Sequence, residues 1–98
     1  MNDKILNYIG LATGAGKTVT GEEKTLEAIK TGKTKVVLLA ANAGKSTRKR
    51  IEDKCATYDV TVIDKYTNEE LSQATGTYNR VVMAISDKGF ARKIKELL

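Results

Sequence analysis

The sequence contains no histidine and only one cysteine, Cys55. Histidine is the commonest general acid–base catalyst, so its absence removes the usual proton-transfer group of an enzyme. A single cysteine excludes an intramolecular disulfide, and without histidine the chain offers poor material for a zinc site. We therefore expect no metal site and no cofactor.

Long hydrophobic runs are also missing. The longest uncharged apolar stretch extends from Val36 to Ala41, far below the roughly 20 residues that a membrane-spanning helix needs. The first ten residues begin polar and lack the long apolar segment of a signal peptide. We expect no membrane partner and a cytoplasmic location.

Two short motifs resemble the end of a phosphate-binding P-loop, at Gly16-Lys17-Thr18 and Gly44-Lys45-Ser46. A P-loop also needs a glycine five positions before the Gly-Lys pair, because consecutive backbone N–H groups must fold around the phosphates. Leu11 and Leu39 occupy those positions. Neither motif is a P-loop, so a nucleotide hydrolase is disfavoured and we expect no enzyme.

Length and charge indicate what kind of protein remains. The 98 residues are 41% hydrophobic, which suits one core, and we expect a single domain over residues 1–98. Lysine and arginine number 17 against 12 aspartates and glutamates, a net charge of +5. An excess of positive charge is typical of surfaces that bind nucleic acid, although many basic proteins do not bind it.

Helical spacing of apolar residues recurs along the chain. It predicts helices around Ile5–Ala12, from Thr20 to Gly32, around Ile51, Cys55 and Tyr58, after Thr67, and around Phe90, Ile94 and Leu97. Capping boxes are predicted at Thr20/Glu23 and Thr67/Glu70. The spacing makes Cys55 a small buried residue rather than a reactive thiol.

Strands are predicted between these helices. A brief strand fits near residues 17–19, and continuous apolar runs favour strands at KVVLLAA, VTVI and RVVMAIS. Alternating helices and strands predict an α/β protein with helices on both faces of a small sheet, mixed but mostly parallel, of about four strands.

Four strings in this order, ILNYIGLATGAGKTVTGEE, KVVLLAANA, DKCATYDV and RVVMAISDKGFA, together resemble the YlxQ-like bacterial branch of the L-seven-Ae ribosomal-protein family. The resemblance covers nearly the whole chain. It implies a three-layer α/β/α sandwich that binds kink-turn RNA, with the start of the second helix in the major groove at tandem sheared G·A pairs. A later loop packs against an extruded nucleotide.

The family signature at the second helix falls on residues 21–27, where Gly21 matches. Glu23 stands where Asn or Lys donates to a base, Lys24 where an acceptor stands, and Glu27 where a lysine faces phosphate. The second contact loop aligns with residues 76–80 and contains Tyr78. The RNA-binding residues expected from the resemblance are Lys17, Gly21, Glu22, Glu23, Lys24, Thr77, Tyr78, Asn79 and Arg80.

The resemblance therefore implies a non-enzymatic, monomeric RNA-binding protein whose partners are structured RNA, such as rRNA or an mRNA leader, and the ribosome. Lys24 is equally well interpreted as a solvated lysine, and Tyr78 as a residue that pins its own loop. Glu23 and Glu27 motivate the alternative of a ribosome-associated protein-interaction module that has lost specific kink-turn binding.

Overall fold

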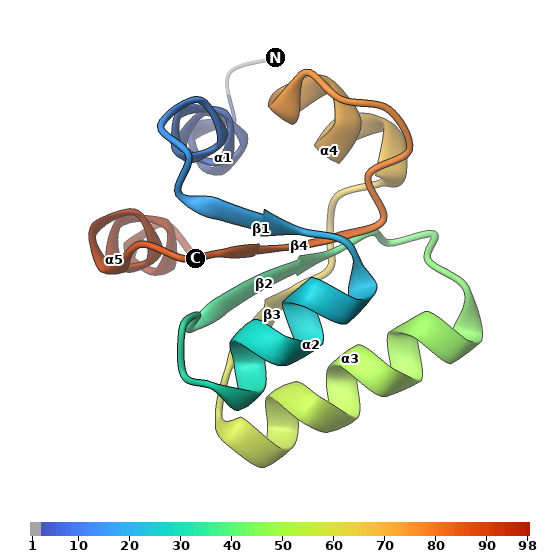
Figure 1. The fold of residues 1–98 in the computed structure, drawn as a ribbon. Helices are drawn as coiled ribbons and strands as arrows, with labels where there is room; N and C mark the ends of the chain where they lie inside the picture. The colour runs from blue at the N-terminus through green and yellow to red at the C-terminus, as the bar shows by residue number, and fades with distance from the viewer. Residues whose placement is uncertain (1–2) are drawn as a thin grey trace.

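The computed structural model describes residues 3–98, in which helices and strands alternate (Figure 1). The elements are α1 Lys4–Gly14, β1 Thr18–Thr20, α2 Glu22–Lys30, β2 Val36–Leu39, α3 Lys45–Tyr58, β3 Thr61–Ile63, α4 Asn68–Thr75, β4 Val82–Ile85 and α5 Lys88–Glu96. Within the described range, no helix combines the length and the apolar character needed to cross a bilayer.

The four strands form one sheet in the order β1-β4-β2-β3. Helices α1, α4 and α5 cover one face, and α2 and α3 cover the other (Figure 1), so the predicted α/β/α sandwich around a mixed four-stranded sheet is confirmed. The expectation of mostly parallel pairing is wrong. Only β2 and β3 pair in parallel, whereas β4 runs antiparallel to both β1 and β2.

The direction of β4 follows from the connection that precedes it. A parallel strand would require a crossover that carries the chain back to the other end of the sheet. Helix α4 has only 8 residues, and the loop after it returns the chain to the end of the sheet where β2 stops. There the N–H of Ala40 donates to the carbonyl oxygen of Val81 at 2.8 Å. Strand β4 must therefore run antiparallel to β2.

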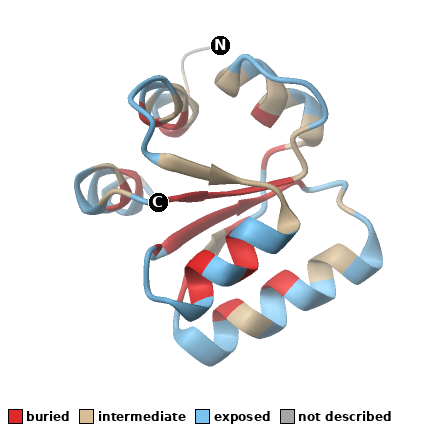
Figure 2. Cartoon of the chain, in the orientation of Figure 1, coloured by how far each residue is buried: buried red, intermediate tan, exposed pale blue. Residues whose placement is uncertain are grey.

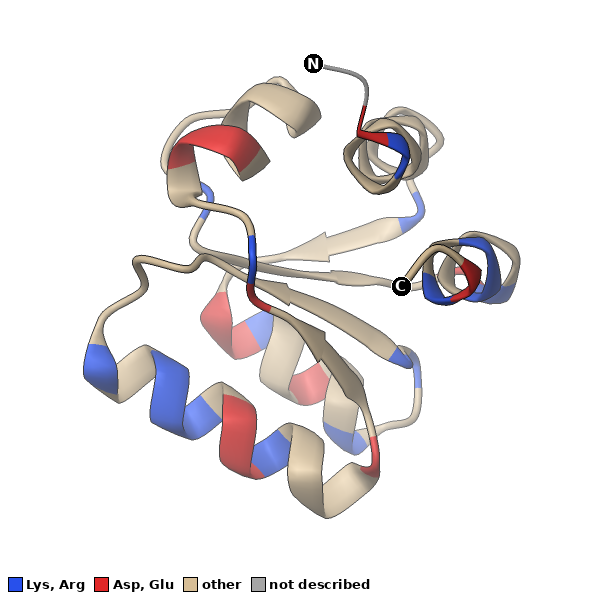
Figure 3. Ribbon diagram, turned by 180° about the vertical axis from the view of Figure 1, so that it is seen from behind, with Lys and Arg blue, Asp and Glu red and all other residues tan. Residues whose placement is uncertain are grey.

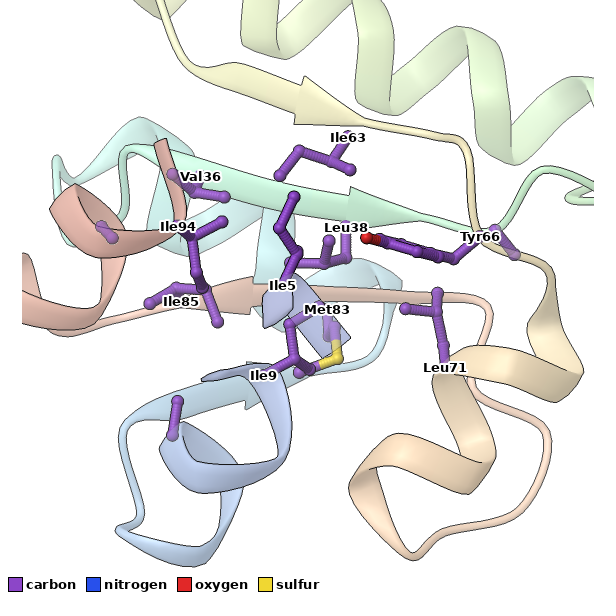
Figure 4. Close-up of a cluster of buried hydrophobic side chains, with 13 residues drawn as sticks. Ile5, Ile9, Val36, Leu38, Ile63, Tyr66, Leu71, Met83, Ile85 and Ile94 are labelled. Carbon is purple, nitrogen blue, oxygen red and sulfur yellow. The ribbon is translucent and has the colours of Figure 1, made fainter. Parts of the chain in front are cut away.

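The central strands are buried on both faces, as their continuous apolar runs predict (Figure 2). Alternate residues serve opposite layers. Val36 and Leu38 belong to the cluster under α1, α4 and α5, which also contains Ile9 (Figure 4), whereas Val37 and Leu39 contact the layer of α2 and α3. This packing fixes the strand ends from which the surface loops extend.

One of the two predicted capping boxes is present. Thr67 caps α4, and Glu70 completes the box. The box predicted at Thr20 is wrong, because Thr20 pairs with Met83 as the last residue of β1 and Gly21 takes the N-cap position of α2.

The predicted buried stripe of α3 is correct at Ile51 and Cys55 but wrong at Tyr58, which is 42% exposed. Tyr58 is the last residue of α3, and the next residue, Asp59, already has the left-handed conformation with φ of 57°. The helix therefore ends at this tyrosine, and no further turn of α3 covers its side chain. Arg48 of α3 is half-buried.

Candidate nucleic-acid interface

Three segments meet at one end of the sheet. They are the start of α2 (residues 21–24), the β2–α3 loop (residues 40–44) and the α4–β4 loop (residues 76–80), and we call them together the loop surface (Figure 1). The N–H of Gly21 donates to the carbonyl oxygen of Val82 at 3.2 Å, and that of Ala40 donates to Val81 at 2.8 Å. These backbone bonds hold the segments side by side.

The start of α2 depends on a glycine. Gly21 has φ of 95° and ψ of 154°, a conformation that side chains other than glycine's rarely adopt. No described side chain caps this helix. The first N–H groups of a helix have no intrahelical acceptor, and together they carry a partial positive charge. The first turn of α2 therefore presents donors of the kind that bind anions.

The two glutamates at this helix start are not free. Arg50 of α3 donates through Nη2 to Glu23 at 3.0 Å and through Nη1 to Glu22. The hydroxyl of Thr47 donates to the other carboxylate oxygen of Glu22 at 2.8 Å. The hydrogen bond and charge of Glu23 are the main reasons that the pKa of Arg50 is raised. The acidic charge beside the helix start is thus partly neutralised across the two helices.

Arg48 ties the same end of α3 to the β2–α3 loop. Its Nη2 donates to the carbonyl oxygens of Ala40 and Ala41, each at 3.2 Å. Its Nη1 pairs with Glu52 and Asp64, each at 3.1 Å. The hydrogen bond that Arg48 donates to Asp64 is the largest cause of the raised pKa of this guanidinium. Arg48 therefore positions the loop rather than extending to solvent.

The α4–β4 loop is compact, and its aromatic side chain points outward. Gly76 caps α4 in the left-handed conformation, and the N–H of Thr77 donates to the carbonyl oxygen of Ser72 at 2.9 Å. Asn79 is also left-handed, with φ of 54°. Tyr78, between these fixed residues, is 89% exposed. A tyrosine that pinned its own loop would be covered by it, so this exposure argues against that interpretation.

Asparagines connect this loop to the other segments. The Nδ2 of Asn68 donates to Oδ1 of Asn79 at 2.8 Å, and the backbone N–H of Asn68 donates to Oδ1 of Asn42 at 2.9 Å. The N–H of Arg80 donates to the hydroxyl of Ser72 at 2.8 Å. The β2–α3 loop, the start of α4 and the α4–β4 loop are therefore held in one arrangement.

The structure brings together the predicted residues of α2 and of the α4–β4 loop, but it places Lys17 elsewhere. Lys17 precedes β1 and its carbonyl oxygen accepts from Ser86 after β4, so it lies at the opposite end of the sheet from Gly21. Sequence reasoning also missed Arg50 and Asn68. No local pattern pairs residues 22 and 50, whereas Asn68 could be suspected from its place in a predicted capping box.

A model of the Ribosomal protein L7Ae/L30e/S12e/Gadd45 family matches residues 3–95. The chain belongs to this family. "RNA-binding protein YlxQ" of Enterococcus faecium is 42% identical over 95 residues, which cover 97% of this chain and 91% of the relative. The Bacillus subtilis protein of the same name is 38% identical over 90 residues, 92% and 90% of the two chains. The expected YlxQ-like branch is thus confirmed.

More distant members of the family include a ribosomal protein. "Large ribosomal subunit protein eL30" of Dictyostelium discoideum is 34% identical over 90 residues, covering 89% of this chain and 80% of the relative. A solved protein of unknown function from Bacillus halodurans C aligns with a TM-score of 0.91 and 37% identity over 96% and 95% of the two chains.

A 15.5 kD RNA-binding protein of Giardia lamblia aligns with a TM-score of 0.75 over 100% and 93% of the chains, and at 17% identity it shows the fold alone. The present chain therefore has relatives that are named for RNA binding and relatives that are named for the ribosome.

Proposed function

We propose that this chain is a non-enzymatic RNA-binding protein that recognises structured, kink-turn-type RNA through the loop surface. The observation that carries the proposal is the meeting of an uncapped helix start at Gly21 with the 89% exposed side chain of Tyr78. The names of the relatives support the class of ligand.

Each part of the loop surface has a role in this proposal. The free N–H groups and the positive end of α2 bind phosphate or base acceptors. Tyr78 stacks on an unpaired base, a common way of recognising bases that leave a helix. The bonds of Asn68 and Asn79 hold the loop in its binding arrangement before RNA arrives, which lowers the entropic cost of association.

Specificity for the kink is expected to be modest. Glu23 occupies a position where a donor would contact a base, and it accepts a hydrogen bond from Arg50 instead. Lys24 is exposed and forms no ion pair within residues 3–98, so it remains free to contact phosphate. Each missing base contact of this kind lowers discrimination by about 1–3 kcal/mol.

We further propose that the protein acts as a monomer in the cytoplasm on rRNA or an mRNA leader, in association with the ribosome. The rival function is a protein-interaction module. The pairing of Glu22 and Glu23 with Arg50 favours this rival, because it leaves the start of α2 nearly balanced in charge. Crosslinking in cells separates the two: enrichment of kinked internal loops supports RNA recognition, whereas background RNA with a reproducible protein partner supports the rival.

The direct test is a titration of fluorescently labelled kink-turn RNA against the same RNA with its G·A pairs mutated, at two salt concentrations. Tyr78→Ala should weaken kink-turn binding about 5- to 150-fold, because one base–aromatic stack contributes about 1–3 kcal/mol. Tyr58→Ala is the matched control, since Tyr58 is also exposed but lies at the other end of α3. Equal effects of the two substitutions would show that the loop surface does not hold the RNA.

A further inference from the structure

The end of the sheet opposite the loop surface carries a cluster of cationic side chains. Figure 3 shows basic segments at the start of β1, in the α2–β2 loop and along α5, all on one side of the molecule. The cluster, which we call the lysine patch, consists of Lys17, Lys33, Lys35, Lys88, Arg92 and Lys95.

Two shallow hollows connect these residues. Lys35, Lys88 and Lys95 line one hollow, whose floor includes Ala91. Lys33 borders the adjoining hollow, which also contains Lys35 and Lys88. The α2–β2 loop and α5, distant in the sequence, therefore contribute to a single surface. Lys17 lies at its margin, where its carbonyl oxygen accepts from Ser86 at 2.9 Å.

The lysine patch carries a local excess of positive charge. Its six cationic side chains share the two hollows and their margin with only two carboxylates, Asp87 and Glu96, a local excess of four positive charges, and a third carboxylate, Asp59, precedes β3 at the same end of the sheet. Asp87 is occupied as the N-cap of α5, and Glu96 pairs with Arg92 at 3.7 Å. Within residues 3–98, none of the five lysines of the patch forms an ion pair.

Folding alone does not account for this arrangement. Lys88, Arg92 and Lys95 follow the i, i+4, i+7 spacing that places them on one side of α5, and like charges at that spacing repel one another. Lys95 gains from the negative end of the helix, but Lys88 is the first residue of α5, where a cation is unfavourable. A bound polyanion relieves both costs.

We propose that the lysine patch is a second RNA-contacting surface, which binds the phosphate backbone of an RNA segment other than the one held at the loop surface. It rests on the proposed function only for the class of ligand. The patch and the loop surface face away from each other across a molecule of 32 × 27 × 22 Å, so a straight helix docked on one does not reach the other. Binding here is insensitive to sequence because phosphates carry no base information.

Two triple variants with the same loss of charge test the proposal. Lys35→Gln, Lys88→Gln and Lys95→Gln together alter the patch. The matched control is Lys4→Gln, Lys49→Gln and Lys54→Gln, which alters α1 and α3. The probe is a short regular RNA duplex without internal loops, titrated over a range of salt, with thermal unfolding of each variant measured in parallel.

The patch variant should bind the duplex at least about tenfold more weakly at low salt. The slope of log affinity against log salt should fall by about 2, since each lost phosphate contact contributes about 0.7–0.9. The control should change affinity less than about threefold, the residual effect of net charge. Equal losses in both variants, or no loss in either, would refute a localised second surface.

A measurement on the unaltered protein avoids any question of folding. RNA duplex should protect Lys35 and Lys88 from acetylation while leaving Lys49 reactive. The proposal would be overturned if RNA did not protect these lysines from acetylation and the protein instead sedimented with phosphatidylserine–phosphatidylcholine vesicles. That result would assign the patch to a lipid surface. If the wild-type protein bound kink-turn RNA no better than the RNA with mutated G·A pairs, the proposed function would be wrong. Duplex binding that still depended on the lysine patch would then continue to support this inference.

Discussion

Replacement of Asn79 tests whether the α4–β4 loop already has its RNA-binding conformation in the free protein. Asn79 does two things in the free protein. Its backbone adopts the left-handed conformation at φ of 54°, and its Oδ1 accepts a hydrogen bond from Asn68 at 2.8 Å. Asn79→Ala removes the hydrogen bond and places a residue with little tolerance for positive φ at this position. Asn79→Gly removes the hydrogen bond but keeps the backbone conformation accessible.

The magnitudes of these two effects differ. A left-handed conformation costs an ordinary residue about 1–2 kcal/mol, and asparagine less. The exposed hydrogen bond adds about 0.5 kcal/mol, at the low end of the usual range. Asn79→Ala should therefore disfavour the binding arrangement of the loop by about 1.5–2.5 kcal/mol, or roughly 10- to 60-fold in equilibrium. Asn79→Gly should cost about 0.5–1 kcal/mol, including the added freedom of the glycine.

The kink-turn titration and thermal unfolding together measure this cost. If the loop of the alanine variant relaxes to another conformation, the cost appears as weaker RNA binding with little change in melting temperature. If the loop cannot relax, the melting temperature falls and RNA affinity is kept. An alanine variant that matches the wild type in both RNA affinity and melting temperature would refute the idea that the loop already has its RNA-binding conformation in the free protein.

Three other outcomes are expected. Glu23→Asn with Glu27→Lys should raise kink-turn affinity and G·A preference in the same titration, by about 1–3 kcal/mol for each restored contact; no gain would mean that α2 does not meet RNA. Burial opposes ionisation of Asp3, but hydrogen bonds from Tyr66 and the backbone lower its pKa overall. The contribution of ionised Asp3 to the free energy of unfolding should therefore be lost as the pH falls below about 4. In acid-unfolding experiments, Asp3→Asn should make the free energy of unfolding less dependent on pH in this range. Burial raises the pKa of Cys55 to about 11, so Ellman's reagent should label it far faster in denaturant than in the native protein; rapid native labelling would contradict its burial.

Much of the fold is local in origin and could be predicted from the sequence. The apolar runs at β2 and β4 are buried on both faces, and Thr67 with Glu70 forms the predicted capping box. Residues 76–80 form the predicted loop before the last strand, although the sequence leaves open whether Tyr78 is exposed or pins that loop. The spacing of apolar residues and the motifs that cap helices involve residues close together in the sequence. They can therefore be recognised without knowledge of the tertiary structure.

Other features depend on distant segments. The reversed direction of β4 depends on the path after α4, which apolar patterning does not encode. Thr20 fails as a cap because Met83 pairs with it across the sheet. The partner of Glu23 is Arg50, from another helix, so the charge near the helix start could not be judged from residues 21–27 alone. The likewise distant Ser86 contact places Lys17 away from Gly21.

Salt should act unequally on the two proposed surfaces. Contacts at the loop surface come from backbone donors and the stacking of Tyr78, beside two glutamates that Arg50 neutralises in part, so few counterions leave the RNA on binding. The five lysines of the lysine patch form no ion pair among the described residues, and RNA binding there releases a counterion for each phosphate that the patch contacts. Rising salt therefore weakens attachment to regular helices faster than attachment to a kink. On these proposals, the ratio of kink-turn to duplex affinity increases with salt even though both affinities fall, and removal of the patch raises that ratio at low salt.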